Sequence, residues 1–312
     1  MCRLKSGLIL KNRVFVPEYD SHTEMLEELG IKDDYLNASK TFVRVELSPA
    51  NGDVFSDIDT WELNVDQDIM PEWYDEDIYK PQVVEAVKTW ANNHIHIGVD
   101  NLKISTGSNH YIKDCKDVDI DGNATVKYIY GNATVKYICG NATVKYIYGN
   151  ATVKNICGNA TVKYICGNAT VKNICGNATV EYIDGNATVK YIYGNATVKY
   201  ICGNATVEYI YGNATVKYIY GNATVKYICG NATVEYIDGN ATVKYIYGNA
   251  TVENICGSAT VTNAKGMSVI IGSEYGWNKK DTLILAENAT FKDRQTKTIY
   301  QSGDWTLVKK EG

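Results

Sequence analysis

The sequence predicts a mainly β protein built on a parallel β-solenoid, with a small α+β domain before it. A nine-residue unit, Gly-Asn-Ala-Thr-Val-Lys-Tyr-Ile-Tyr, is written sixteen times between residues 122 and 265, with few changes. A fixed short period is typical of stacked repeats. The third to fifth residues, Ala-Thr-Val, alternate apolar and polar as in a short strand. Glycine and β-branched residues in every unit oppose a long helix.

Each position of the unit, numbered 1 to 9, has an expected place in the coil. Gly and Asn at positions 1 and 2 predict a turn, because both tolerate positive φ. Ala at position 3, Val at position 5 and Ile at position 8 are expected inside. Val and Ile are an odd number of residues apart, so the strand must bend near positions 6 and 7. The variable positions 6, 7 and 9 are therefore expected outside.

One coil is expected to contain either two units or three units, which gives an 18-residue or a 27-residue coil. Equivalent residues stack about 4.8 Å apart, so like charges at position 6 would repel. In the seventh to fifteenth units, stacking every second unit gives four opposite-sign and three like pairs. Stacking every third unit gives one opposite-sign and five like pairs. This favours the 18-residue coil, while the 27-residue spacing of Cys175, Cys202, Cys229 and Cys256 keeps the 27-residue coil as the alternative.

Four segments are expected along the chain. Residues 1–97 do not repeat and predict an α+β head, residues 98–121 a cap of degenerate coils, residues 122–265 the solenoid, and residues 266–312 a C-terminal β cap. Caps are needed because an open solenoid end exposes unpaired strand edges. The head's expected elements are a strand or hairpin at 7–17, a helix opened by the capping box Ser21–Glu24 and ending near Leu29, strands at 41–47 and 61–65, a solvated acidic turn at 72–77 and a helix at 81–94.

Charge and cysteine usage narrow the function classes. The net charge of −5 divides into about +6 on the repeat and −11 elsewhere. The sequence has no recognisable secretion signal or membrane-spanning stretch, so we expect a cytoplasmic protein, with a place in a virion as the alternative. Seven of nine cysteines share position 9 with Tyr, Asp and Lys. A position that accepts such different residues predicts free thiols rather than a disulfide framework.

Catalytic and metal-binding motifs are not expected. His94 and His96 should lie on one side of an extended segment, but no Cys or carboxylate has a matching spacing nearby. The repeat lacks the glycines and aspartate of calcium-binding nonapeptides. No nucleophile–base pair or phosphate loop appears, so we expect no enzyme activity, cofactor or metal. The fifteen Asn-Ala-Thr sequences within residues 122–265 match a glycosylation pattern, but stacked asparagines are expected instead to form a hydrogen-bonded ladder.

A repeated Lys/Tyr surface is the candidate functional feature. Lys at position 6 and Tyr at positions 7 and 9 suit a macromolecular partner, a protein or a glycan, held by charge and ring stacking. Nucleic acid fits less well, because +6 is a weak charge for it. No membrane partner is expected. The candidate residues are Lys127, Tyr128, Lys145, Tyr146, Lys190, Tyr191, Lys217, Tyr218, Lys244 and Tyr245.

The units GNATVKYIY resemble those of an uncharacterised group of repeat proteins from gut Bacteroidales and their phages. The stretch from GLILKNRVFVPEYD to EWYDEDIY is similar to their leading domain. This resemblance implies no activity and no functional residues. The architecture is also similar to pentapeptide-repeat solenoids, some of which imitate DNA and inhibit topoisomerases through an acidic surface. We therefore expect a non-enzymatic binding or structural rod. The alternatives are a phage or mobile-element inhibitor of a host protein, and an ice-binding repeat protein.

Overall fold

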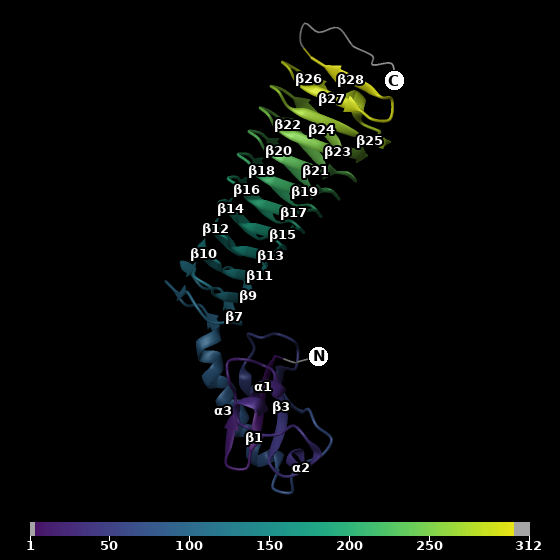
Figure 1. Ribbon diagram of the computed structural model, residues 1–312. Coiled ribbons are helices and arrows are strands. Elements are labelled where there is room, and N and C mark those ends of the chain that lie inside the picture. The colour runs from purple at the N-terminus through teal and green to yellow at the C-terminus, as the bar shows by residue number, and fades with distance from the viewer. Residues whose placement is uncertain (1–3, 303–312) are drawn as a thin grey trace. The chain divides into compact units, whose positions relative to one another are not determined.

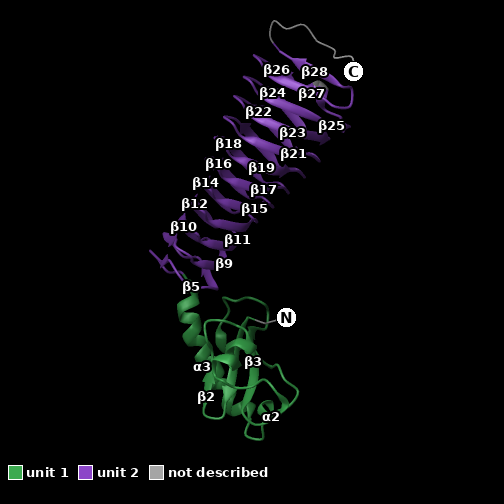
Figure 2. Ribbon diagram, in the orientation of Figure 1, with its two compact units in different colours: residues 1–97 green, residues 98–312 purple. Residues whose placement is uncertain are grey.

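The computed structural model describes residues 4–302 and divides between Ile97 and Gly98 into two compact units (Figure 2). The first unit is the head and the second holds the repeats. Within the described residues, no helix has both the length and the hydrophobicity to cross a bilayer.

The head is built on a four-stranded antiparallel sheet of order β2-β1-β3-β4. Helix α1 covers one face, where Met25 and Leu26 pack against Leu8 and Phe42. The predicted hairpin, the helix capped by Ser21 and both later strands are confirmed. The elements are β1 (Lys5–Leu10), β2 (Arg13–Phe15), α1 (His22–Glu28), α2 (Tyr35–Ala38), β3 (Phe42–Pro49), η1 (Ile58–Thr60), β4 (Trp61–Val65), α3 (Glu76–His94) and β5 (Ile95–Ile97).

Helix α3 corrects three expectations. It begins at Glu76, so the end of the acidic stretch is its N-cap and first turn, not only a solvated turn. Asp75 accepts a hydrogen bond from the backbone of Asp77, and acidic side chains there favourably meet the positive end of the helix. Pro81 lies inside the helix, although we expected it to open the helix. His94 is the last helical residue, so it does not share an extended segment with His96.

The repeats form two parallel sheets, named here the odd wall and the even wall (Figure 1). The odd wall contains β7 (His110–Lys113), β9 (Thr125–Tyr130), β11 (Thr143–Ile147), β13 (Thr161–Ile165), β15 (Thr179–Ile183), β17 (Thr197–Ile201), β19 (Thr215–Ile219), β21 (Thr233–Ile237), β23 (Thr251–Gly257), β25 (Val269–Trp277), β27 (Thr290–Asp293) and β28 (Thr298–Gln301). The even wall contains β6 (Lys103–Ile104), β8 (Val118–Ile120), β10 (Thr134–Ile138), β12 (Thr152–Ile156), β14 (Thr170–Ile174), β16 (Thr188–Ile192), β18 (Thr206–Ile210), β20 (Thr224–Ile228), β22 (Thr242–Ile246), β24 (Thr260–Ala264) and β26 (Ile284–Leu285).

One coil of the solenoid spans two units, so stacked equivalents such as Asn123 and Asn141 are separated by 18 in sequence. Each repeat strand pairs in parallel with the strand two units away, so Val126 lies beside Val144. The 18-residue prediction is confirmed, and the 27-residue alternative is wrong. Opposite charges at position 6 lie beside each other in neighbouring coils, as the 18-residue coil predicts. Lys199 lies 3.9 Å from Glu181, and Lys226 lies 3.9 Å from Glu208.

The space between the walls is filled by columns of Ala, Val and Ile. Nearly all of these side chains are fully buried, from Ala124 to Ile255. At most turns the position 3 amide donates to the position 9 carbonyl of the preceding unit, as Ala142 does to Cys139 at 3.2 Å. The glycine between them has positive φ, +65° at Gly140. A Cβ on Gly140 would lie 2.8 Å from the backbone nitrogen of the glycine one coil before, so side chains are excluded there.

The two ends of the solenoid depart from the repeat. Strands β6, β7 and β8 continue the walls without the unit's sequence. At the other end Phe291 packs between Trp277 and Tyr300, and β28 turns back antiparallel to β27. The Trp277 indole donates to the carbonyl of Ala259 at 2.7 Å. Larger side chains thus close the core where the thin repeat stops.

Candidate binding surface

Tyrosines at position 7 form an unbroken ladder along the odd wall. Neighbouring rings have centroids 4.7–5.7 Å apart and interplanar angles of 9–29°, so each ring stacks on the next. The parallel register produces this ladder, because it sets position 7 of one coil beside position 7 of the next. The members are Tyr111, Tyr128, Tyr146, Tyr164, Tyr182, Tyr200, Tyr218 and Tyr236.

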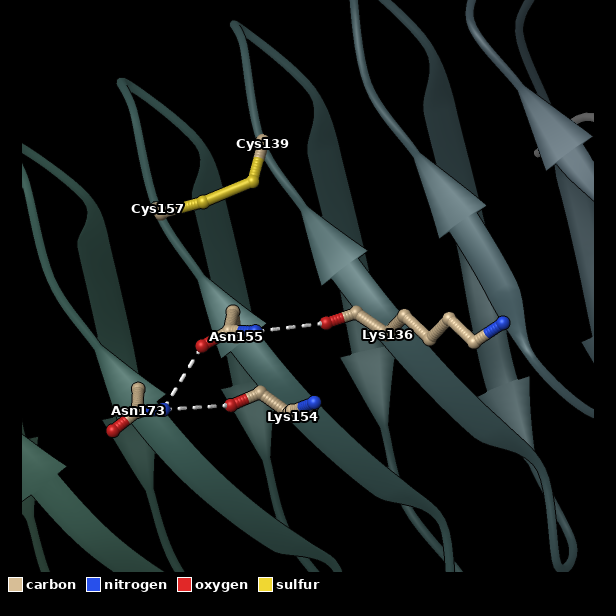
Figure 3. Close-up of a disulfide and its surroundings, with 6 residues drawn as sticks. All are labelled: Lys136, Cys139, Lys154, Asn155, Cys157 and Asn173. Carbon is tan, nitrogen blue, oxygen red and sulfur yellow. Dashed lines mark hydrogen bonds between the residues drawn. A yellow bond between two sulfur atoms is a disulfide. The ribbon is translucent and has the colours of Figure 1, made fainter.

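The even wall has a shorter ladder made of Tyr191, Tyr209, Tyr227 and Tyr245, with centroids 4.6–5.4 Å apart. In the coils before it, asparagines replace tyrosine at position 7 (Figure 3). The Asn173 amide donates to the Asn155 side-chain oxygen at 2.9 Å and to the Lys154 carbonyl at 3.3 Å. Where asparagine replaces tyrosine, a hydrogen-bonded ladder therefore replaces the aromatic one, and the parallel register of the strands stays the same.

The stacking of the tyrosines changes what this surface offers to a ligand. The faces of rings inside a ladder are turned toward their neighbours, so the ring edges and phenol hydroxyls remain for contact. A ligand base or sugar cannot stack on a face that another ring already covers. Inside the ladders we therefore expect hydrogen bonding and edge contact to contribute more to ligand binding than stacking on position 7.

The lysines at position 6 lie against these rings. The Nζ of Lys145 is 5.3 Å from the centroid of the Tyr146 ring, and that of Lys190 is 5.2 Å from Tyr191. The same contact recurs for Lys163, Lys217, Lys226 and Lys244 at 5.2–6.0 Å. Such cation–π contacts at exposed sites contribute about 0.5–1 kcal/mol each. They orient the ammonium groups into rows along the wall.

The ten predicted surface residues lie on two walls rather than one, because consecutive units alternate between the walls of an 18-residue coil. Lys127, Tyr128, Lys145, Tyr146, Lys217 and Tyr218 belong to the odd wall. Lys190, Tyr191, Lys244 and Tyr245 belong to the even wall. A ligand that follows one wall therefore meets only part of the predicted set.

Charge is unevenly divided between the walls. At position 6 the odd wall has five lysines and three glutamates, whereas the even wall has six lysines and one glutamate, Glu208. The even wall also has a shallow groove of about 390 Å³ between its Thr and Lys columns. Its lining is Thr170, Val171, Lys172, Thr188, Lys190, Thr206, Glu208 and Lys226. The most basic face of the repeat therefore also has a concave strip.

Position 9 contradicts the expectation that every thiol is free. Cys139 and Cys157, one coil apart on the even wall, form a disulfide with their Cα atoms 4.8 Å apart (Figure 3). Stacked cysteines fall within the 4.4–6.8 Å that a disulfide spans. The signal in the sequence is the 18-residue spacing of these two cysteines, because it equals one coil. The other described cysteines of position 9 are free.

Burial and hydrogen bonds shift the acidity of the free position 9 groups. Burial raises the pKa of the Cys202 and Cys256 thiols to about 11. A hydrogen bond to Cys175 raises the pKa of Tyr193 to about 12, and one to Cys202 does the same for Tyr220. The Cys202 and Cys256 thiols therefore stay protonated at neutral pH and are poor nucleophiles.

The asparagines at position 2 form the predicted ladders. From Asn141 to Asn249, each position 2 side-chain amide donates to the asparagine oxygen one coil before at 3.2–3.4 Å, as from Asn141 to Asn123 and from Asn150 to Asn132. The position thus has a structural role at the turns of the repeat.

Comparison of the chain with protein-family models, with curated proteins and with solved structures finds no match. The stacked 18-residue coils are consistent with a pentapeptide-repeat-like architecture. The function must accordingly be argued from the surface itself.

Proposed function

We propose that the solenoid is a non-enzymatic binding module whose even wall binds an elongated, acidic glycan. The observation that carries this proposal is the alignment of six lysines in one column beside a groove, with a single glutamate among them. Ammonium groups repeated at the strand spacing suit a polymer with regularly spaced negative charges. Many weak contacts along one polymer act together, so modest single contacts suffice.

The chemistry of the wall favours a glycan over nucleic acid. Single-stranded nucleic acids bind most strongly where bases stack on open aromatic faces, and the faces inside these ladders are covered by other rings. Phenol and threonine hydroxyls remain, and both donate and accept hydrogen bonds. Sugars present hydroxyls along their whole length, and uronic acids add the carboxylates that lysine attracts.

The two alternative functions, a DNA-mimicking inhibitor and an ice-binding protein, fit the repeat surface less well. A topoisomerase inhibitor that imitates DNA needs an acidic rod, and both walls have more lysine than glutamate at position 6. A flat ice-binding Thr surface is interrupted here by the neighbouring Lys column. We propose a cytoplasmic location, with a virion as the alternative, as expected from the sequence. The proposed source, a gut Bacteroidales or phage system, rests on the resemblance of the repeats alone.

The test compares two triple variants of the untagged full chain. Lys172→Gln, Lys190→Gln and Lys226→Gln remove three charges from the even wall, and Lys145→Gln, Lys163→Gln and Lys217→Gln remove three from the odd wall. Binding to polygalacturonate, with neutral dextran as the control polymer, is measured by calorimetry at several salt concentrations. We expect the even-wall variant to bind at least about tenfold more weakly, with a flatter salt dependence.

Equal losses in both variants would overturn the assignment to the even wall. Absence of polygalacturonate binding by the unaltered chain, together with binding of single-stranded DNA or of a protein, would overturn the glycan proposal.

A further inference from the structure

A cluster of three possible metal ligands lies in the head. His22, Glu46 and Asp66 each offer one ligand atom, and these atoms lie within 4.8 Å of one another. They come from the first turn of α1, from the middle of β3 and from the residue after β4. Their positions are fixed by the sheet, because the Asp66 amide donates to the Arg44 carbonyl at 2.9 Å.

The imidazole of His22 is oriented as a metal ligand would be. Its Nε2 lies 3.1 Å from the backbone oxygen of Val45. A carbonyl can only accept, so Nε2 is the nitrogen that carries the proton. In the neutral ring Nδ1 then has the lone pair, and it faces Asp66 with Nδ1 3.5 Å from the carboxylate Oδ2. Ligand histidines commonly donate their second N–H to a backbone carbonyl in this way.

Glu46 gives the second, independent observation. Its residue is only 6% exposed. Within residues 4–302 no hydrogen bond or ion pair is found for its carboxylate. Two basic side chains of the same sheet are engaged elsewhere, because Lys5 pairs with Asp20 at 2.7 Å and Arg44 pairs with Asp33. A carboxylate in a residue that is only 6% exposed has lost most of its contact with water, and a cation between it and the Asp66 carboxylate would stabilise both.

We propose that His22, Glu46 and Asp66 form a binding site for a divalent transition metal ion. One imidazole and two carboxylates suit ions such as Zn²⁺, Mn²⁺ or Co²⁺ better than soft ions that prefer sulfur. The Asp66 side chain is 57% exposed, so water can reach the ion and fill its remaining positions. The site does not depend on the glycan proposal, which concerns the solenoid.

The test titrates Co²⁺ into the untagged full chain and records its visible d–d absorption. We expect one Co²⁺ per chain, without the thiolate-to-metal charge-transfer band that binding to the repeat cysteines would give. His22→Gln, Glu46→Gln and Asp66→Asn should each weaken binding at least about tenfold, while His96→Gln should leave it unchanged. Circular dichroism of each variant verifies that the head is folded.

Two results would overturn the site. One is Co²⁺ binding that the three variants leave unchanged, or that shows the thiolate band. The other is no binding by the unaltered chain while Glu46→Gln raises the melting temperature, which would make Glu46 an uncompensated buried charge rather than a ligand.

Discussion

At the scale of single residues, each position of the repeat is determined by its copies one coil before and after. Cys139 bonds to Cys157 because both occupy position 9 of adjacent even-wall coils. Cys175 occupies the same place one coil further on, and its amide donates to Ile156 at 2.9 Å just as the Cys157 amide donates to Ile138. Both neighbours of Cys157 are therefore equivalent disulfide partners.

We predict that Cys139→Ser moves the disulfide to Cys157 and Cys175. The Cys157 thiolate attacks oxidised glutathione and releases one glutathione thiolate, and the Cys175 thiolate then attacks the resulting mixed disulfide and releases the second glutathione thiolate. Peptide mapping by mass spectrometry under mild oxidation by oxidised glutathione checks the pairing. Cys229→Ser is the control and should leave the original disulfide in place. A Cys157 that stays unpaired in Cys139→Ser would contradict equal stacking.

A second residue-scale prediction uses neighbouring residues of β18. Val207 is fully buried and Thr206 is exposed. Val207→Asp should lower the free energy of unfolding by at least about 3 kcal/mol, because it buries an unpaired charge. Thr206→Asp should change it by less than about 1 kcal/mol. Urea unfolding followed by circular dichroism measures both, and similar losses would show that the inward assignment is wrong.

At the scale of the strand, the bend at positions 6 and 7 allows both Val and Ile to face the core while Lys and Tyr face out. This bend and the 18-residue coil could be predicted, because they follow from patterns within a few repeats. The disulfide could not be predicted before the coil length was known. The cluster of His22, Glu46 and Asp66 could not be predicted at all, since it depends on how separate elements of the head pack.

The position 6 columns give an element-scale prediction. Glu181→Lys places a lysine between Lys163 and Lys199, so two attractive neighbours become repulsive. Exposed pairs contribute about 0.2–1 kcal/mol each, so we expect a loss of about 1 kcal/mol at low salt that shrinks at high salt. Glu181→Gln is the control and should lose less. Melting temperatures measured in low and high salt test this prediction. A loss of stability that does not depend on salt would rule out the charge explanation.

At the scale of the whole molecule, the free cysteines at position 9 make the free energy of unfolding vary with pH in the alkaline range. Burial raises the pKa of Cys166, Cys202, Cys229 and Cys256 above the ordinary value. Above roughly pH 8.5 these thiols ionise first in the unfolded chain, which then binds fewer protons than the folded chain. The free energy of unfolding must therefore fall as pH rises, while below that pH these groups have no effect.

We predict that stability to urea falls between pH 7.5 and 9.5. Replacing all four of these cysteines by Ala should remove much of that fall, and the disulfide of Cys139 and Cys157 is kept in both proteins. An identical pH dependence in the two proteins would show that folding does not raise the pKa of these thiols.

The central claim is that stacked 18-residue coils build a cumulative binding surface. Deleting residues 212–229, or residues 212–247, removes one or two whole coils, and with them Lys226, or Lys226 and Lys244, of the even wall. Every remaining strand stays on its own wall. Calorimetry with polygalacturonate measures the affinity of each deletion variant, after circular dichroism shows that the β-structure persists. We predict a stepwise loss of affinity with each coil removed. Equal affinity in all three proteins would contradict the claim, because the repeats would then only set the length of the rod.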